Sequence, residues 1–276
     1  MSNATDPSQA TLPLAELTPT EKYTVEHVTW LHHWAPTLFS FRLSRSAAYQ
    51  FIPGQFARLG LRKPDGEFVW RAYSICSAPA ADYLEFFSVV VPDGEFTARV
   101  AAYTTADVLL VEKKAQGFLT ADRFYRSEGR KDLWMLATGT GLGPYISLLH
   151  DAETWRRFEN LIVVHSARHA NELAYAQSLK EMQSRAPFSD AVAKLRYVPT
   201  VTRELAAGAL QGRIGALIAD GQLEKAAGVN LSLDYSRFML CGNPQMVEET
   251  RALLKERGFR NDRKLEAGHI AVENYW

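Results

Sequence analysis

Cysteine is scarce in this sequence: Cys76 and Cys241 are the only two among 276 residues. Two thiols cannot bind an iron–sulfur cluster or an all-thiolate zinc ion, and they are too few for a disulfide framework. We therefore expect no metal site of these kinds. A reducing compartment suits such a sequence best, so we expect a cytoplasmic protein.

Net charge is absent as well, because 31 Lys and Arg residues balance 31 Asp and Glu residues. No overall field draws the chain to nucleic acid or to an anionic membrane, so electrostatic docking must be local. No uninterrupted apolar run reaches the ~18 residues that a membrane span needs. The first 20 residues lack a basic start and a continuous apolar stretch, which is typical of a disordered tail rather than a signal peptide.

Apolar residues, by contrast, make up 47% of the chain and aromatic residues 11%, enough for packed cores. The length favours two domains, since single hydrophobic cores tend to stop growing near ~150 to 250 residues. The pattern of apolar runs changes after the charged stretch 123–131. We expect a tail over residues 1–20, one domain over 21–128 and another over 129–276.

The first domain shows short apolar runs broken by turn residues, and Phe39, Phe41 and Leu43 alternate with polar neighbours as in a strand. Evenly spaced short strands of this kind predict an antiparallel β-barrel. The further runs lie at 56–61, 73–76, 84–91 and 108–111.

The second domain alternates apolar strands with longer helical stretches, which predicts an α/β domain with a parallel sheet. Strands are expected at 133–137, 161–164, 195–198 and 238–240, and helices near 172–184 and 245–257. The last helix is the best defined, because Asn243 can cap it, Pro244 suits its first turn and Gly258 can end it.

A glycine-rich turn follows the first strand of this second domain. Glycines at 139, 141 and 143 let backbone amides approach a pyrophosphate, and Pro144 is suited to open the next helix. A tight strand-to-helix turn uses glycine in any case, so the purely structural interpretation stays open. No Gly-Lys-Ser/Thr follows, which argues against a mononucleotide P-loop.

Three arginines, Arg168, Arg203 and Arg213, follow the second and third strands of this domain. A guanidinium is the natural partner for the 2′-phosphate of NADPH. Each arginine alone fits a solvated surface position equally well, but the three together favour NADPH.

In the expected barrel, Arg71 and Tyr73 share one face of a strand, and Ser74 follows them. A charge beside a flat ring could serve a phosphate and an aromatic heterocycle together. An ordinary half-buried strand explains the same residues.

Four motifs occur in order between Tyr23 and Trp276: Pro-Gly-Gln-Phe (53–56), Arg-Ala-Tyr-Ser (71–74), Gly-Thr-Gly-Leu-Gly-Pro (139–144) and Cys-Gly-Asn-Pro-Gln-Met (241–246). With them the chain resembles the bacterial ferredoxin/flavodoxin–NADP⁺ reductases of the ferredoxin–NADP reductase superfamily. The aromatic end, residues 273–276, resembles one bacterial subclass. The resemblance implies an FAD-binding β-barrel, an NADP(H)-binding α/β domain and non-covalent FAD.

For FAD, the resemblance implies that Arg71 binds the pyrophosphate, Tyr73 packs on the flavin and Ser74 hydrogen-bonds near its N5 atom. Thr97 supplies a second phosphate contact from a turn, and the three valines before that turn line the flavin edge or are plain strand core. The full implied set is Arg71, Ala72, Tyr73, Ser74, Val89, Val90, Val91, Glu95, Phe96, Thr97, Tyr275 and Trp276.

For NADP(H), the resemblance places Cys241 beside the nicotinamide, although a small buried strand residue is an alternative role. The implied set is Thr138, Gly139, Thr140, Gly141, Gly143, Arg168, Arg203, Arg213, Cys241 and Gly242.

The C-terminal residues complete the implied site. Tyr275 would stack on the isoalloxazine and Trp276 on the adenine of a folded FAD, as a lid that moves before nicotinamide can stack. Glu273 is the implied carboxylate of a proton relay with Ser74, and a frayed terminal glutamate is the alternative. The implied catalytic set is Ser74, Cys241, Glu273 and Tyr275.

The resemblance implies a monomeric enzyme in which NADPH reduces FAD, and FAD passes electrons singly to ferredoxin or flavodoxin. Such carriers are acidic, so a basic patch is expected near the flavin edge, with Arg58, Arg62, Lys63, Lys113 and Lys114 as candidates. Two alternatives stay open: a reductase component for an oxygenase or a haem protein, and a non-catalytic nucleotide-binding redox sensor.

Overall fold

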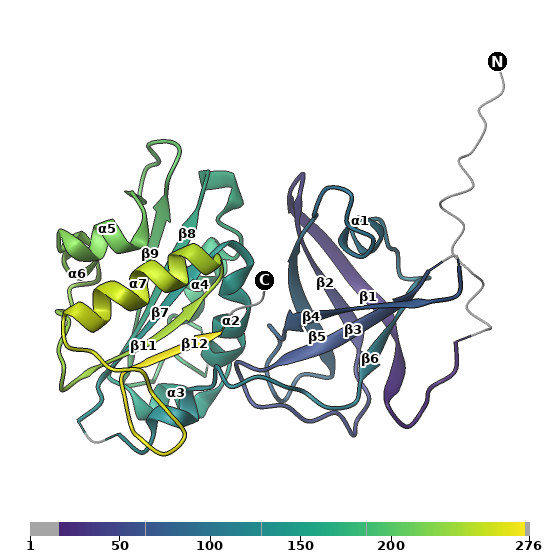
Figure 1. Ribbon diagram of the computed structural model, residues 1–276, viewed down its shortest axis with the longest axis horizontal. Coiled ribbons are helices and arrows are strands. Elements are labelled where there is room, and N and C mark those ends of the chain that lie inside the picture. Colours follow the sequence, from purple (N-terminus) through teal and green to yellow (C-terminus); the bar gives the residue numbers. More distant parts are fainter. Residues whose placement is uncertain (1–16, 64, 128, 186, 274–276) are drawn as a thin grey trace.

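The computed structural model describes residues 17–63, 65–127, 129–185 and 187–273. They form two sheets that lie side by side, an antiparallel one from the first half of the chain and a parallel one from the second (Figure 1). The two-part architecture that the sequence predicts, a β-barrel followed by an α/β domain, is confirmed.

The antiparallel sheet has six strands in the order β4-β3-β6-β1-β2-β5. The sheet closes on itself where Ile75, just after β4, bridges Phe86 in β5 and the Cys76 amide donates to the Glu85 carbonyl at 2.8 Å. Closure removes the exposed strand edges, so this sheet is a barrel. Its elements are β1 (Tyr23–Ala35), β2 (Leu38–Ser44), β3 (Phe56–Arg62), β4 (Phe68–Ser74), β5 (Tyr83–Val89), the short helix α1 (Thr97–Val100) and β6 (Val108–Glu112).

The barrel interior confirms the alternation seen in the sequence. Phe39, Phe41 and Leu43 are fully buried, and Tyr73 and Phe96 pack in the same core. Each large apolar side chain buried in this way contributes roughly 1.5–3 kcal/mol. The alternating strand is therefore a principal determinant of this domain.

The parallel sheet has the strand order β10-β9-β8-β7-β11-β12. The chain steps outward from β7 to β10 on one side and then crosses to β11 and β12 on the other, which makes β7 and β11 neighbours at the topological switch point. Ligands of such sheets bind at the carboxyl ends of the strands there. The strands are β7 (Asp132–Thr138), β8 (Asn160–Ala167), β9 (Lys194–Val201), β10 (Leu210–Gln211), β11 (Ser236–Cys241) and β12 (Ile270–Glu273).

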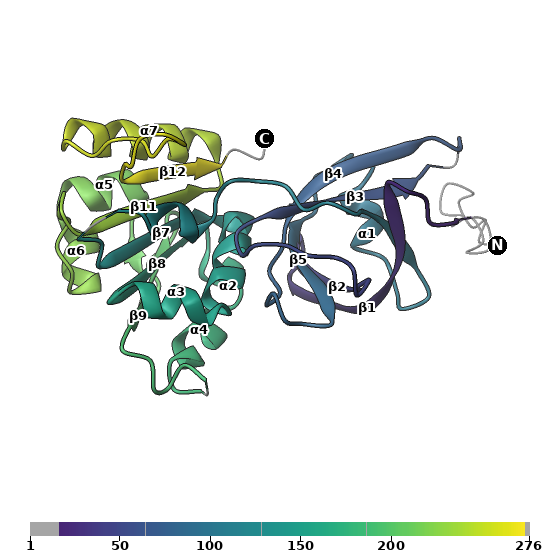
Figure 2. The same ribbon diagram turned by 90° about the horizontal axis from the view of Figure 1, so that it is seen from below.

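Helices cover both faces of this sheet (Figure 2). Along β7, Leu133 and Met135 pack in the core on one side, while Trp134 and Leu136 pack in the core on the other. One face carries α2 (Gly143–Leu149), α3 (Ala152–Arg157) and α4 (Ala176–Met182), and the other α5 (Ile214–Ala219), α6 (Gln222–Ala227) and α7 (Pro244–Glu256). Short 3-10 turns lie at η3 (Ala121–Phe124), η4 (Gly139–Leu142) and η5 (Ala170–Glu172).

The final helix begins as the sequence predicts. The Asn243 side chain accepts hydrogen bonds from the amides of Gln245 (2.9 Å) and Met246 (3.2 Å), and Pro244 occupies the first turn. Gly258, at φ +91°, follows its last turn. An N-cap of this kind is worth about 1 kcal/mol.

The helix predicted near 172–184 differs in the structure. It is divided into η5 and α4, because Tyr175 between them adopts a left-handed backbone with φ 61° and ψ 0°. The helix that Pro144 was expected to open is α2, whereas the sequence analysis did not predict α3, α5, α6, β10 and β12 as separate elements. These elements are short, so their periodic patterns are weak.

One hydrophobic core runs across both domains. Leu38, Phe87 and Phe124 from the barrel and its connecting segment share a buried cluster with Leu142 and Tyr145 of the parallel-sheet domain. The barrel is therefore packed against the face that carries α2 and α4. Within the described ranges, no helix is long and apolar enough to cross a bilayer.

Candidate functional site

The turns after β7 and β11 interlock at the switch point. A Cβ added to Gly141 would lie 2.4 Å from the Cys241 carbonyl oxygen, and one added to Gly242 would lie 2.2 Å from Thr138 Oγ1. The same Thr138 hydroxyl accepts a hydrogen bond from the Asn243 amide at 2.7 Å. The two glycines are thus required by close backbone approach, which fixes the floor of the site.

Gly139 serves a different purpose. It has φ +52°, and a Cβ there would meet no atom within 4 Å in the described part of the chain. The turn is therefore open on its outer side, where Thr138 and Thr140 are half-buried. Backbone amides next to open space at the carboxyl end of a central strand can receive a phosphate.

The three predicted arginines meet at the same edge of the sheet. The Arg203 amide donates to the Arg168 carbonyl at 3.0 Å, and the Gly212 amide, beside Arg213, donates to Val201 at 2.9 Å. All three side chains are exposed. Among the described residues none of their guanidinium groups has a hydrogen bond or an ion pair, which leaves them available to an anion.

Nearby carboxylates are engaged by the backbone. Glu172 Oε2 accepts from the amides of Arg168 (2.9 Å) and His169 (3.2 Å), and Glu204 Oε1 accepts from the Ala170 amide at 2.5 Å. These bonds hold the loop after β8 in shape. Within the described residues, neither acid forms an ion pair with the three arginines.

On the barrel, Arg71 and Tyr73 differ in environment. Arg71 is exposed and, among the described residues, its side chain donates only to the neighbouring Trp70 carbonyl, from Nη1 at 2.9 Å. Tyr73 is 8% exposed, its hydroxyl lies 3.2 Å from Ser88 Oγ, and burial raises the pKa of Tyr73 to about 12. Tyr73 therefore stays protonated, and Arg71 is the free cation of this strand.

The turn that the resemblance assigns to FAD is built around Thr97. Its Oγ1 accepts from the Val91 amide at 2.9 Å, and the Gly94 amide donates to the Val91 carbonyl at 3.0 Å. Phe96 is buried against the Tyr73 ring, with centroids 5.6 Å apart, while Glu95 is exposed. Val89 and Val90 are half-buried, Val91 is exposed, and Ala72 in β4 is exposed.

The two domains meet at Ser74. A Cβ at Gly143 would lie 3.2 Å from Ser74 Cβ and 3.2 Å from Cys76 Sγ, so the start of α2 lies directly against the end of β4. The Ser147 hydroxyl donates to the Ser77 carbonyl across the same junction at 2.8 Å. The glycine-rich turn and the Arg-Ala-Tyr-Ser strand therefore form one site.

Cys241 and Glu273 lie at this junction too. They are opposite each other in the β11–β12 pairing, and a Cβ at Gly117 would lie 2.7 Å from Glu273 Oε1 and 2.9 Å from the Phe56 ring. Burial raises the pKa of the Cys241 thiol well above its usual range, and the Glu273 carboxylate raises it further. Cys241 is thus a neutral thiol in the interior.

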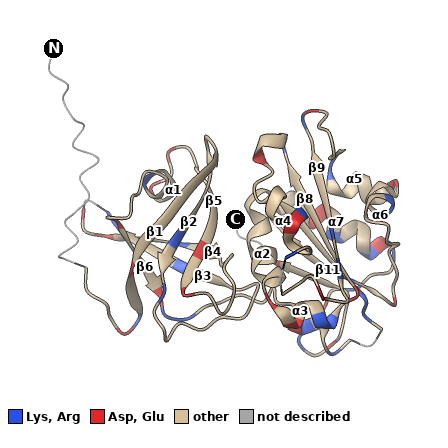
Figure 3. Cartoon of the chain, turned by 180° about the vertical axis from the view of Figure 1, so that it is seen from behind, with Lys and Arg blue, Asp and Glu red and all other residues tan. Residues whose placement is uncertain are grey.

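Two sets of predicted residues remain. Tyr275 and Trp276 lie outside the described residues. In the expected basic patch, Arg58 is paired with Glu112 at 2.9 Å and Lys63 with Asp65 at 3.0 Å, while Lys113 and Lys114 are exposed. Figure 3 shows basic and acidic residues interspersed over both domains.

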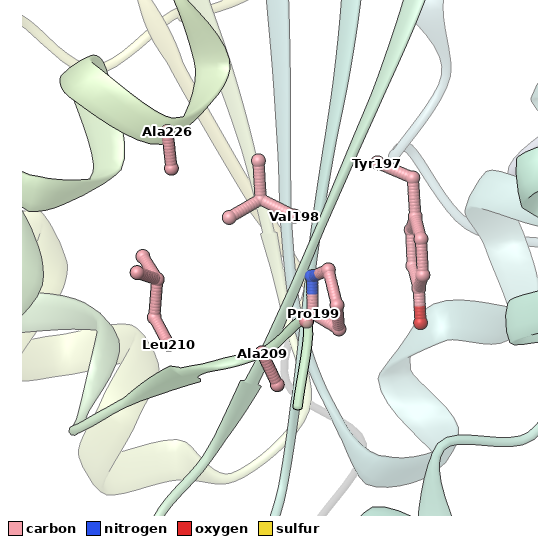
Figure 4. Close-up of a pocket in the computed structure, with 7 residues that line it drawn as sticks. Tyr197, Val198, Pro199, Ala209, Leu210 and Ala226 are labelled. Carbon is pink, nitrogen blue, oxygen red and sulfur yellow. The ribbon is translucent and has the colours of Figure 1, made fainter. Parts of the chain in front are cut away.

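A pocket of about 310 Å³ lies elsewhere, along the outer edge of β9 (Figure 4). Apart from Tyr197 its lining is apolar or glycine, and it contains none of the predicted site residues. We do not assign it to the site at the domain junction.

The comparisons with known proteins agree with this geometry. Residues 135–252 match the model of the oxidoreductase NAD-binding domain. The chain is 43% identical over 250 residues to the flavodoxin/ferredoxin–NADP reductase of Escherichia coli strain K12, covering 90% of this chain and 97% of that one. It is 40% identical over 252 residues to the ferredoxin–NADP reductase of Pseudomonas aeruginosa, covering 90% and 95%.

A solved structure is similar over nearly the same length. It is a ferredoxin NADP⁺ reductase from Neisseria gonorrhoeae with bound FAD and NADP, which superimposes with a TM-score of 0.86 at 36% identity, covering 93% of this chain and all of that one. The chain belongs to the flavodoxin/ferredoxin–NADP reductase family.

Proposed function

We propose that this protein is an FAD-dependent oxidoreductase that takes electrons from NADPH and delivers them one at a time to ferredoxin or flavodoxin. One observation carries the proposal. Gly143 of the glycine-rich turn lies against Ser74 of the barrel strand, so a dinucleotide on the turn and a cofactor on the strand would meet.

The barrel residues fit an FAD phosphate. Arg71 is exposed, and its only hydrogen bond in the described residues is to a neighbouring carbonyl, so its guanidinium is free to bind a diphosphate. We assign the second phosphate contact to the turn over Glu95, Phe96 and Thr97. Phe96 can contribute through its backbone only, because its ring fills the barrel core.

The parallel-sheet residues fit NADP(H). The open turn at Gly139 suits the pyrophosphate, and Arg168, Arg203 and Arg213 offer three guanidinium groups where the 2′-phosphate distinguishes NADPH from NADH. Cys241, small and neutral, leaves room for a flat ring at the floor of the site. When bound, FAD would accept a hydride from NADPH and release its electrons singly.

Proton handling falls to Ser74 and Glu273. Ser74 has a hydroxyl at the junction, and Glu273 lies there beside Gly117 and opposite Cys241. We propose that Ser74 donates a hydrogen bond toward the reacting face and that Glu273 exchanges its proton with solvent. The aromatic cover formed by Tyr275 and Trp276 rests on the family resemblance. Deleting Trp276 would raise the hydride-transfer rate if this cover has to move; an unchanged rate and unchanged FAD affinity would remove it from the mechanism.

The direct test is to purify the chain with its FAD and mix it with NADPH or NADH in a stopped-flow spectrometer. NADPH should bleach the flavin at least tenfold more efficiently than NADH, and the reduced enzyme should then support ferredoxin- or flavodoxin-linked cytochrome reduction. A chain that binds FAD but is not reduced by NADPH would instead be a redox sensor. A flavin that NADPH bleaches but that passes electrons to neither ferredoxin nor flavodoxin would favour a reductase component for an oxygenase or a haem protein.

We also propose that the carrier docks by local charge, with Lys113 and Lys114 as the exposed basic pair directly after β6. Arg58 and Lys63 contribute less, because acidic neighbours already pair with them. The rate with ferredoxin should fall as salt rises through the physiological range, and a salt-independent rate would rule the patch out. We further infer a monomer, a cytoplasmic location, and domain limits of 21–128 and 129–276.

A further inference from the structure

Tyr175 belongs to the parallel-sheet domain, but its side chain joins a hydrogen-bond network of the barrel, and its backbone is strained. Its φ of 61° and ψ of 0° are unfavourable for a bulky residue. Such a conformation persists only where the surroundings determine it, and it marks a position worth explaining.

The surroundings of the Tyr175 ring come from the barrel. The ring lies 4.7 Å from Trp34 and 5.3 Å from Phe87, centroid to centroid, and it meets Phe87 edge-on. The side chain is 9% exposed. An aromatic ring from one domain is therefore enclosed by two from the other.

The hydroxyl of Tyr175 is in a hydrogen-bond chain with one possible direction. It donates its single proton to Glu85 Oε1 at 2.8 Å, so the Ser40 hydroxyl, 2.5 Å away, must be the donor in their contact. Ser40 in turn accepts from Trp34 Nε1 at 2.9 Å. Arg42 Nε donates to the second oxygen of Glu85 at 2.7 Å, so every bond points toward this carboxylate.

Burial of Tyr175 maintains this direction of the hydrogen bonds. It raises the pKa of Tyr175 well above its usual value, so the hydroxyl remains a donor. Hydrogen bonds to a carboxylate are stronger than those between neutral groups. The hydrogen bonds that run from Ser40 through Tyr175 to Glu85 therefore form a directional and specific anchor between the two domains.

The same loop connects this anchor to the arginines. Arg168 directly follows β8, the turn η5 comes next, and Tyr175 lies seven residues after Arg168. The amides of Arg168, His169 and Ala170 are all bound by carboxylates, which stiffens the segment. A displacement at Tyr175 would thus be transmitted to Arg168.

We propose that Tyr175 is a positioning residue that fixes the parallel-sheet domain on the barrel, so that a dinucleotide held at Arg168 meets the barrel cofactor in one orientation. The proposal rests on the proposed function. It assigns no contact between Tyr175 and either cofactor. Its prediction is that removing the hydroxyl impairs the alignment of the two cofactors and spares the binding of each.

The test compares Tyr175→Phe with the wild type, both as full chains carrying FAD. The phenylalanine keeps the ring between Trp34 and Phe87 and removes the bond to Glu85. Hydrogen exchange of the amides from 170 to 175 should accelerate about tenfold. Flavin bleaching at saturating NADPH should slow about tenfold, while FAD content and the Kd for adenosine 2′,5′-bisphosphate stay unchanged.

Two further variants complete the design. Tyr49→Phe is the matched control, because the Tyr49 hydroxyl is buried in the barrel without a hydrogen-bond partner in the described residues, and it should behave as wild type. Ser40→Ala breaks the same series of hydrogen bonds from the barrel side. Because Tyr175→Phe and Ser40→Ala disrupt one series of hydrogen bonds, bleaching in the double variant should be little slower than in Tyr175→Phe alone.

Two outcomes would overturn the proposal. One is a Tyr175→Phe variant with wild-type exchange and bleaching. The other is a variant whose slower bleaching is explained by lost FAD or lost adenosine 2′,5′-bisphosphate binding, since the residue would then support binding or folding instead of alignment. Failure of the proposed function would look different: the wild type itself would not be bleached by NADPH, and the exchange measurement would still report on the anchor.

Discussion

The barrel and the parallel sheet present their candidate ligands in different ways. In the parallel sheet, Arg168 and Arg203 follow adjacent strands and meet because the carboxyl ends of parallel strands share one edge. In the barrel, Arg71 and Thr97 come from a strand and a distant turn, and only closure of the barrel brings such segments together. The site on the parallel sheet is positioned by strand topology and backbone, whereas the site on the barrel is positioned by individual side chains.

Gly242→Ala should have the largest effect, because it tests whether the parallel-sheet site depends on close backbone contact. A Cβ there would lie 2.2 Å from Thr138 Oγ1 and 2.6 Å from the Thr138 carbonyl oxygen, and φ is +127°. The variant should lose about 3 kcal/mol or more of unfolding free energy and most of its NADPH affinity, as measured by denaturant titration and by flavin bleaching. Gly215→Ala, where a Cβ would meet no atom of the described residues within 4 Å, is the control. A stable Gly242→Ala enzyme with normal NADPH affinity would contradict a site built on backbone contact.

Acid should destabilise the parallel-sheet domain relative to the barrel, by a free energy of unfolding similar to the loss expected for Gly242→Ala. His165 in β8 is fully buried, and burial lowers its pKa from 6.5 to about 4, whereas the barrel residues His27, His32 and His33 are exposed. The unfolded chain takes up a proton near pH 6.5 and the folded chain only near pH 4. The stabilisation is therefore complete above pH 6.5 and declines by roughly 3 kcal/mol as the pH falls to 4.

Denaturation curves between pH 7.5 and 4.5 measure this effect. A His165→Gln variant should show a shallower loss of stability than the wild type over that range. If both chains lose stability in parallel, His165 is not the source. Hydrogen exchange at pH 5 should show the parallel sheet opening before the barrel.

Arg71→Ala tests the side-chain half of the comparison. Because Arg71 is exposed and, within the described residues, bonds only to a neighbouring carbonyl, the barrel should remain folded. A lost charge-assisted contact of about 1.5–3 kcal/mol would weaken FAD binding ten- to a hundredfold. Fluorescence titration of the apoprotein gives the affinity, and Lys113→Ala is the control. Equal FAD affinity in the two variants would exclude Arg71 as a phosphate ligand.

Arg203→Ala should have the smallest effect, because Arg168 and Arg213 remain at the same edge. We expect about a tenfold weaker affinity for NADPH and an unchanged affinity for NADH, with Lys225→Ala in α6 as the control. An equal loss for both nucleotides would mean that Arg203 supports the loop and does not read the 2′-phosphate.

The same difference explains what the sequence could predict. The glycine turn was proposed from its glycine spacing and the three arginines from their positions after successive strands, because the carboxyl ends of the strands converge in a doubly wound sheet. Arg71 and Tyr73 remained ambiguous until the family resemblance was considered, since alternation along one strand does not tell which segment lies opposite. The Asn243 cap was predicted because all its partners are local.

The domain junction could not be predicted. Tyr175 bonds Glu85 across 90 residues and contacts Ser40 across 135, and no local pattern encodes such pairs. Its left-handed backbone also divided a stretch that we expected to be one helix. Gly117, which makes room for Glu273, gave no signal beyond a turn residue.

The hydrophobic core that crosses from the barrel to the α2 face has a consequence for exchanging parts between relatives. Leu38, Phe87 and Phe124 belong to the same buried hydrophobic cluster as Leu142 and Tyr145. A chimera that joins this barrel to the nucleotide-binding half of another reductase must therefore transplant these residues as a set. Although the two sheets are built from separate halves of the chain, the two domains are not independent modules at their interface.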